Sequence, residues 1–305
     1  MIPYLFETVF SKEAPHPWRL LVFFVYSVAM TSLATTADSV AFPVILLWAV
    51  LIAAVGGFGV VAPWLAARGG RERAIAYGNS FAGGVLLAAG LIHLLPDAND
   101  GFTSAYPDLD YPAAFAVATL AFILVLGLER VVPRAMAVGR EDGDLEAAAL
   151  VGAGESRGGF APYLLLLTLS IHSLIAGLTL GISAPAGASI LLIAILAHKG
   201  AAGFALGSTF REAAIPPRTR IPALLVFVGS TPLGVILGGA AIDLFGAGDG
   251  AAVAWFKAVA AGTFLYVATL DIVREEFFPG GTNRGRRLLW AIIGAGIMAL
   301  VALWV

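Results

Sequence analysis

The sequence contains no cysteine in its 305 residues. It can therefore form no disulfide, hold no metal through a thiolate and perform no thiol redox chemistry. Charged residues are also scarce, at 12% of the chain, which is about half their share of a soluble domain. The net charge of −2 and the absence of a basic patch exclude a nucleic-acid partner. Any bound metal must be held by nitrogen and oxygen atoms.

Long apolar sequence takes the place of the missing charge. Hydrophobic residues make up 59% of the chain and the mean hydropathy is +0.91. A helix needs about 20 apolar residues to cross the hydrocarbon core of a bilayer. Eight such runs, separated by turn or charge signals, predict an all-α integral membrane protein in the lipid bilayer. They are 42–66, 76–96, 112–131, 161–183, 187–208, 221–243, 252–273 and 287–305.

A further apolar run, at about 18–37, precedes these eight. It fits either a leading ninth helix or a cleaved signal peptide, because a basic start, an apolar core and small residues before Asp38 belong to both patterns. We favour the helix, since Lys12 and Arg19 suit a cytoplasmic N-terminus. The predicted N-terminal segment is therefore 1–41, and the helix bundle occupies 42–305.

The connections between the eight runs differ sharply in charge. Alternate connections contain fourteen of the 18 Lys and Arg residues, and the intervening loops "DANDGFTSAYPDLDY", "SAPAG" and "DLFGAGDGA" contain none. The fourteen are Arg68, Arg71, Arg73, Arg130, Arg134, Arg140, Arg157, Arg211, Arg218, Arg220, Arg274, Arg284, Arg286 and Arg287. By the positive-inside rule these connections are cytoplasmic and the C-terminus is external. The Arg- and Ala-rich composition hints at a prokaryotic source, so the expected location is the plasma (inner) membrane.

One internal connection is long, at about 132–160. It is polar, rich in small residues and without an apolar period. These properties predict a flexible cytoplasmic linker inside the bundle domain rather than a folded water-soluble domain.

Polar residues interrupt the fourth and fifth runs near their middle. His172 and Ser173 lie in the fourth run, and His198 and Lys199 lie in the fifth. Ionisable groups are costly at this depth and are functional candidates by default. The four-residue connection "APAG" makes the two helices a hairpin and sets both imidazoles at similar depth. Neutral imidazole binds Zn²⁺ and related cations well, although buried histidines can also simply tie helices together.

Several stretches of the sequence resemble one family. "HSLIAGLTLG" and "HKGAAGFALG" are similar to the fourth- and fifth-helix signatures of the ZIP (Zrt/Irt-like) divalent metal transporters, which read His-Ser/Asn-x-x-Glu/Asp-Gly and His-Glu/Lys. Further likeness lies in the second, sixth and seventh helices, at 85–98, 230–239 and 261–277. The resemblance implies an eight-helix ZIP-like bundle that moves zinc, or alternatively iron or manganese, toward the cytoplasm. The metal is then the transported substrate, and no resident cofactor is expected. A homodimer is a possible oligomeric state.

The resemblance also assigns residues. It implies that His172, His198 and Ser173 hold the metal between the fourth and fifth helices. Lys199 would place its ammonium where some relatives bind a second cation. Gly177 is a small position beside this site that permits close helix approach.

The chain departs from the family pattern at two positions. The carboxylate expected one turn after His172 is Ala176, and the second carboxylate that some members carry is Ala202. Without either anion, desolvating a divalent cation is expensive. This departure motivates an alternative, a metal-blind ZIP-like protein with a scaffold or regulatory role.

Other acidic and histidine residues are candidates for an entrance, an exit or a replacement anion. His93 and Asp97 lie one turn apart near an acidic external loop, which can attract cations or be only a solvated surface. Asp271 and the following Glu275 and Glu276 lie near the cytoplasmic end of the seventh helix, where Asp271 can equally pair with an arginine.

An intramembrane hydrolase using His172, Ser173 and His198 is the third hypothesis. Adjacent residues on a helix point about 100° apart, so the serine is poorly placed to bond its supposed base. We therefore expect a transporter and not an enzyme.

Overall fold

The computed structural model describes residues 42–130, 161–182, 185–245, 250–273, 277 and 283–303. The predicted N-terminal segment 1–41 and the predicted linker at 132–160 lie outside these residues. The described chain forms eight helices at the predicted places, which confirms the all-α bundle. Their bounds are α3 Phe42–Arg68, α4 Glu72–Ala88 continuing through η1 Ala89–Leu94 into α5 Leu95–Ala105, α6 Ala113–Arg130, α9 Ala161–Ile182, α10 Pro185–Glu212, α11 Pro217–Phe245, α12 Gly250–Tyr266 continuing into η3 Val267–Val273, and α14 Arg284–Val301.

Prolines and a glycine mark several helix ends. Pro185 and Pro217 are the first residues of α10 and α11. Proline suits this position because its φ angle is already helical and the first N–H of a helix has no partner. Between α3 and α4, Gly70 has a φ of +66°, which a residue with a side chain rarely adopts. Local sequence therefore fixes where these helices begin and turn.

The second helix is longer than its apolar run predicts. It continues past Pro96 to Ala105 through a π-helical segment, η1. A proline inside a regular helix crowds the carbonyl four residues earlier, here that of Ile92, and cannot donate to it. The wider π turn just before Pro96 accommodates both effects. Consequently His93 and Asp97 lie within a continuous helix instead of at its end.

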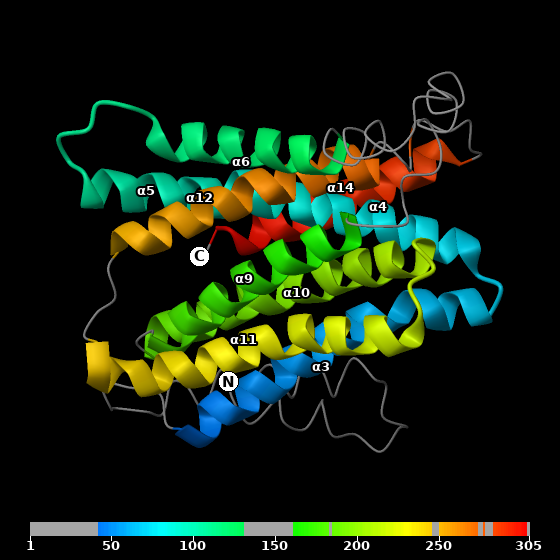
Figure 1. Ribbon diagram of the computed structural model, residues 1–305, viewed down its shortest axis with the longest axis horizontal. Helices are drawn as coiled ribbons and strands as arrows, with labels where there is room; N and C mark the ends of the chain where they lie inside the picture. Colours follow the sequence, from blue (N-terminus) through cyan, green and yellow to red (C-terminus); the bar gives the residue numbers. More distant parts are fainter. Residues whose placement is uncertain are drawn as a thin grey trace, which may run out of the picture.

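The helices pack as two groups (Figure 1). α3, α9, α10 and α11 form one group, which we call the hairpin group because it contains the α9–α10 hairpin. α4 with α5, α6, α12 and α14 form the other, which we call the cover group. The two groups meet chiefly where α10 packs against α4, and α9 also contacts α12.

Glycines allow the closest helix contacts within each group. In the hairpin group, a Cβ at Gly177 of α9 would collide with the backbone carbonyl of Thr231 in α11, and one at Gly234 would collide with that of Leu174. In the cover group, a Cβ at Gly84 would collide with the carbonyl of Ala291. Small residues are the usual means of bringing backbones together in a membrane.

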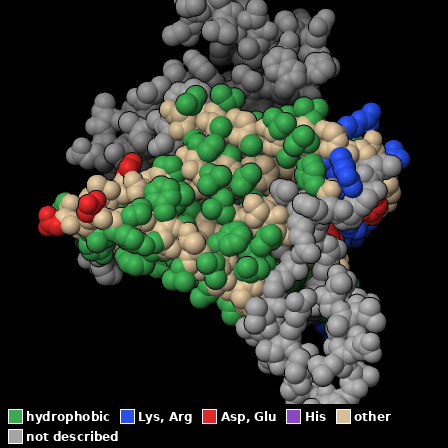
Figure 2. All heavy atoms as spheres, turned by 90° about the horizontal axis from the view of Figure 1, so that it is seen from above, with side chains coloured by type: hydrophobic (Ala, Val, Ile, Leu, Met, Phe, Trp, Pro, Cys, Tyr) green, Lys and Arg blue, Asp and Glu red, His purple; other side chains and the backbone are tan. Residues whose placement is uncertain are grey.

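The exterior has the character of a bilayer-spanning protein. Six of the described helices are long and apolar enough to cross a membrane, and large apolar side chains such as Phe58 and Leu120 are exposed. Figure 2 shows an apolar middle, with lysines and arginines gathered at one end together with some acidic side chains, and with acidic side chains alone at the other end. This is the charge separation that the connecting loops predict.

Replacing Gly234 by Ala is expected to destabilise the α9–α11 contact. The new methyl would press on the α9 backbone, and such overpacking costs about 1–3 kcal/mol. Thermal unfolding of the detergent-purified protein should show a lower Tm. The matched control is Gly229→Ala in the same helix, where a Cβ meets nothing within 4 Å. An equal Tm for the two variants would contradict the packing argument.

Candidate metal site

The α9–α10 hairpin brings two histidines together. The rings of His172 and His198 are 5.6 Å apart between centroids and tilted by 50°. Both side chains are buried. Nε2 of His172 and Nδ1 of His198 have no hydrogen-bond partner among the described residues. Trp48 Nε1, Ser170 Oγ and Thr231 Oγ1 are likewise buried without a partner in the described part of the chain, so the lack of a partner indicates a ligand site only where the atom also lines a cavity.

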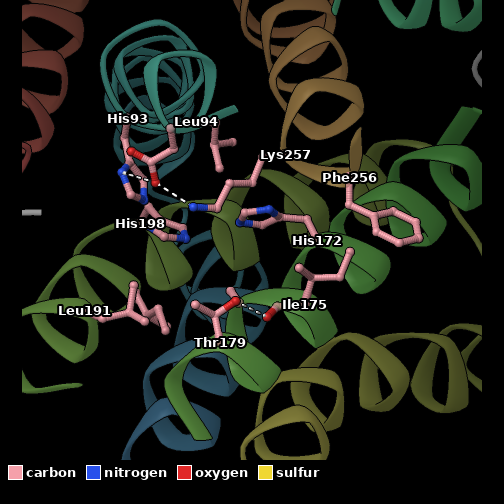
Figure 3. Close-up of a pocket in the computed structure, with 12 residues that line it drawn as sticks. His93, Leu94, His172, Ile175, Thr179, Leu191, His198, Phe256 and Lys257 are labelled. Carbon is pink, nitrogen blue, oxygen red and sulfur yellow. Dashed lines mark hydrogen bonds and ion pairs between the residues drawn. The ribbon is translucent and has the colours of Figure 1, made fainter. Parts of the chain in front are cut away.

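These two histidines line a cavity between the two helix groups. Its volume is about 40 Å³, which is room for a few waters or a partly hydrated cation. Figure 3 shows side chains from both groups pointing into this space. The lining residues are His93, Leu94, Asp97, His172, Ile175, Ala176, Thr179, Leu191, Ile195, His198, Phe256 and Lys257.

The cover group contributes a cluster of charge to the same cavity. Nζ of Lys257 donates a hydrogen bond of 2.8 Å to Oδ2 of Asp97. Nδ1 of His93 lies 3.7 Å from the same oxygen atom. His93 and Asp97 are therefore part of the cavity wall, in contact with α12, and not only neighbours of the external acidic loop.

Lys257 is the functional candidate that sequence reasoning missed. It lies inside the apolar run 252–273, so the cost of charge at membrane depth applies to it as it does to Lys199. The signal was present, but no family motif covers this residue. Only the fold brings it to Asp97, 160 positions earlier in the chain.

Ser173 and Lys199 form a separate polar contact. Nζ of Lys199 donates to Oγ of Ser173 at 2.9 Å and to the backbone carbonyl of Phe227 at 3.0 Å. The same ammonium lies 3.7 Å from the centre of the Phe227 ring, a favourable cation–π distance. Neither Ser173 nor Lys199 is among the residues that line the cavity. The Ser173 hydroxyl therefore serves the buried lysine in this conformation.

The remaining predicted positions divide between the cavity and the packing core. Ala176 lines the cavity, one turn from His172. Ala202 is buried in the apolar core, and Gly177 packs against α11. The backbone of Asp271 lies in η3, but its side chain is outside what the structure describes. Glu275 and Glu276 lie outside the described residues altogether.

The metal-binding groups around the cavity come in two pairs. His172 and His198 belong to the hairpin group, and His93 and Asp97 belong to the cover group. In the described part of the chain, no three His, Asp or Glu side chains stand close enough to form a ready-made metal site. A cation that used both pairs would have to draw them together.

The fold and the cavity define a multi-pass membrane protein with imidazole and carboxylate groups between its helices. The family model described as "ZIP Zinc transporter" matches residues 41–156 and 153–302. The chain belongs to the ZIP zinc transporter family.

Individual relatives agree with this assignment. Zinc transporter 5 of Oryza sativa subsp. japonica is 30% identical over 266 residues, covering 74% of this chain and 75% of that protein. Probable zinc transporter 12 of Arabidopsis thaliana is 28% identical over 320 aligned positions, covering 90% and 89%. Zinc transporter ZIP2 of Mus musculus is 29% identical over 276 residues, covering 78% of this chain and 88% of that protein. The predictions of a divalent metal transporter in the membrane, and of a protein that is not an enzyme, are confirmed.

Replacing Ser173 by Ala tests its contact with Lys199. A buried ammonium would lose one of its two hydrogen-bond acceptors, which costs about 1–3 kcal/mol, so the Tm should fall. Zinc binding should change much less, because the cavity keeps its lining. Ser80→Ala is the matched control, since the buried Ser80 hydroxyl bonds only to the Ala76 carbonyl of its own helix. Lost zinc binding with an unchanged Tm would instead identify Ser173 as a metal ligand.

Proposed function

We propose that this chain moves zinc across the membrane toward the cytoplasm through the cavity between its two helix groups. His172 and His198 bind the ion in this proposal. The observation that carries it is the pair of unpaired, buried imidazole nitrogens on the wall of one cavity. Imidazole is a preferred zinc ligand, and iron and manganese are the alternative cargoes.

Asp97 supplies the negative charge that Ala176 lacks. A divalent cation among neutral groups alone would leave its hydration shell at high cost. Asp97 is the carboxylate among the residues that line the cavity, and His93 beside it adds a third imidazole. We infer that the anion comes from the cover group, whereas the family motif has it on the same helix as the first histidine.

Lys199 has a structural role in this proposal. Its ammonium is bound by Ser173, the Phe227 carbonyl and the Phe227 ring, and it repels a second cation from that side of His198. Within the described residues, the proposed cation site is then the one in the cavity.

The charge distribution supports an inward direction. The arginine-bearing end is cytoplasmic by the positive-inside rule, and the opposite end contains Asp100, Asp108 and Asp110, which are exposed and attract cations. α14 begins at the basic end with Arg284, so the C-terminus is external in this orientation. Four further points remain predictions. They are a plasma (inner) membrane location, a homodimer, the absence of a resident cofactor, and an exit past Asp271, Glu275 and Glu276.

Zinc uptake into liposomes containing the purified protein tests the proposal. His172→Ala and His198→Ala should each reduce uptake by about tenfold or more, because loss of a direct ligand should cost at least as much as loss of an outer-shell partner. Thr119→Ala, on α6 outside the cavity, should transport like the wild type. If wild-type liposomes take up no more zinc, iron or manganese than empty ones, the proposed transport is wrong for these metals.

Introducing a carboxylate at Ala176 should strengthen zinc binding. Glu at this position would lie one turn from His172 on the same wall of the cavity. A negative charge within a few ångströms of a divalent cation should lower the zinc Kd by about tenfold or more. Ala176→Gln is the control, because it adds the same volume without the charge. Equal zinc affinity of the Glu and Gln variants, measured by equilibrium dialysis, would argue that Ala176 does not face the metal.

A further inference from the structure

Lys257 forms an ion pair with Asp97, the carboxylate that the proposed zinc site needs. Its ammonium is 2.8 Å from Oδ2 of Asp97, and that oxygen is also the one nearest to His93. Lys257 reaches this position from α12, and Asp97 from α5, two helices of the same group that pack side by side. A metal ion at this carboxylate would stand close to the ammonium, so the two cations would compete for one negative charge and repel each other.

We propose that Lys257 is a tethered cation that occupies Asp97 while the cavity is empty and that an entering zinc ion displaces. The proposal rests on the function proposed above and adds the device that sets the strength of binding. Lys257 acts through Asp97 and does not touch the transported ion.

The charges around the cavity support a competition. Asp97 and Lys257 together have no net charge, so the paired carboxylate offers a divalent cation little attraction. When the ammonium moves away, the full charge of Asp97 faces the ion. The other titratable side chains that line the cavity are three imidazoles, His93 beside Asp97 and His172 and His198 from the hairpin group. They provide ligands for zinc but no second anion for Lys257.

The geometry allows the lysine to leave. The side chains of Lys257 and Asp97 are 25% and 26% exposed, so neither is locked in the core. In contrast, the Lys199 residue is 2% exposed and its ammonium has three partners. A lysine stem has four flexible carbons, and the ammonium can therefore turn out of the cavity while α12 stays in place.

Such competition would benefit transport. Conduction through a membrane protein needs a site that attracts the ion enough to enter and releases it readily. A tethered ammonium that returns to Asp97 lowers the affinity and assists release. It also leaves a paired carboxylate behind, which avoids an unpaired charge at membrane depth.

The test compares zinc binding by the full-length wild type, Lys257→Met, Lys257→Arg, Asp97→Asn and the Lys257→Met/Asp97→Asn double variant. Radioactive zinc is dialysed to equilibrium against each detergent-purified protein. Lys257→Met should bind zinc about tenfold more tightly or more, because a like charge beside the ion is removed. Lys257→Arg, which keeps the charge, should stay close to the wild type. In liposomes, Lys257→Met should show slower uptake at saturating zinc because release is slowed.

Asp97→Asn removes the group through which Lys257 acts. In that background the gain from Lys257→Met should largely disappear. A gain of full size there would overturn the proposal, because Lys257 would then act as a general charge. Unchanged or weaker zinc binding by folded Lys257→Met would also overturn it and would identify the pair as a structural tie between α12 and α5. If Lys257→Met aggregates on gel filtration, Lys257→Gln takes its place with the same two outcomes.

The transport proposal fails separately from this one. It fails if the wild type neither binds nor moves zinc and His172→Ala changes nothing. In that event, zinc binding by Lys257→Met would still support the tethered cation, and no binding by either protein would overturn both proposals.

Discussion

The absence of water inside a bilayer is the constraint on which this structure depends. Backbone groups that cannot bond to water must bond within the chain, and the described residues accordingly form helices throughout the apolar regions. The same constraint acts on side chains. Lys199 is bound by Ser173 and the Phe227 carbonyl, and Lys257 is bound by Asp97. Some buried polar atoms have no hydrogen-bond partner among the described residues, including Trp48 Nε1, Ser170 Oγ and Thr231 Oγ1. Of the residues with such atoms, His172 and His198 are the ones that line the cavity. An unpaired buried nitrogen is costly unless a ligand uses it, and its position on a cavity wall is the physical reason for proposing these two histidines as the metal ligands.

Close packing gives the site its position. Gly177 and Gly234 bring α9 and α11 into backbone contact, and Gly203 and Gly207 do the same for α10 and α3. These contacts lie within the hairpin group, and comparable glycine contacts lie within the cover group. The cavity lies between the groups and is lined from α9, α10, α12, η1 and α5, with three histidines, Asp97 and Lys257 among its lining residues. Away from the cavity the two groups are in close contact, because α10 packs against α4 and one apolar core contains residues of both groups.

The length of apolar runs was sufficient to predict the eight helices, because the thickness of the bilayer fixes the length of a spanning helix. The prediction ended the second helix too early, at residue 96, since proline ordinarily marks a helix end and a π turn that accommodates Pro96 leaves no local signal. The two histidines lie at similar distances from the short turn between their helices, and this spacing was sufficient to predict that they are neighbours. The interactions of Asp97 and Ser173 could not be predicted in the same way. Asp97 meets Lys257 across 160 positions, and Ser173 meets Lys199 across 26, and which side of each helix faces which neighbour is decided by packing.

The position of Asp97 offers an explanation for the alanine at position 176, because Asp97 places a carboxylate on the other side of the cavity. In the family motif the carboxylate follows the histidine by one turn on one helix, so one rigid element holds both. Here the histidine pair belongs to the hairpin group and the carboxylate to the cover group, and the described residues contain no compact three-ligand cluster. A zinc ion bound by both pairs would therefore join the two groups. Its binding energy would depend on their separation, and any movement that parted them would weaken the site and release the ion. With the anion on the opposite wall, the strength of zinc binding in the proposed site would depend on how closely the two groups approach each other.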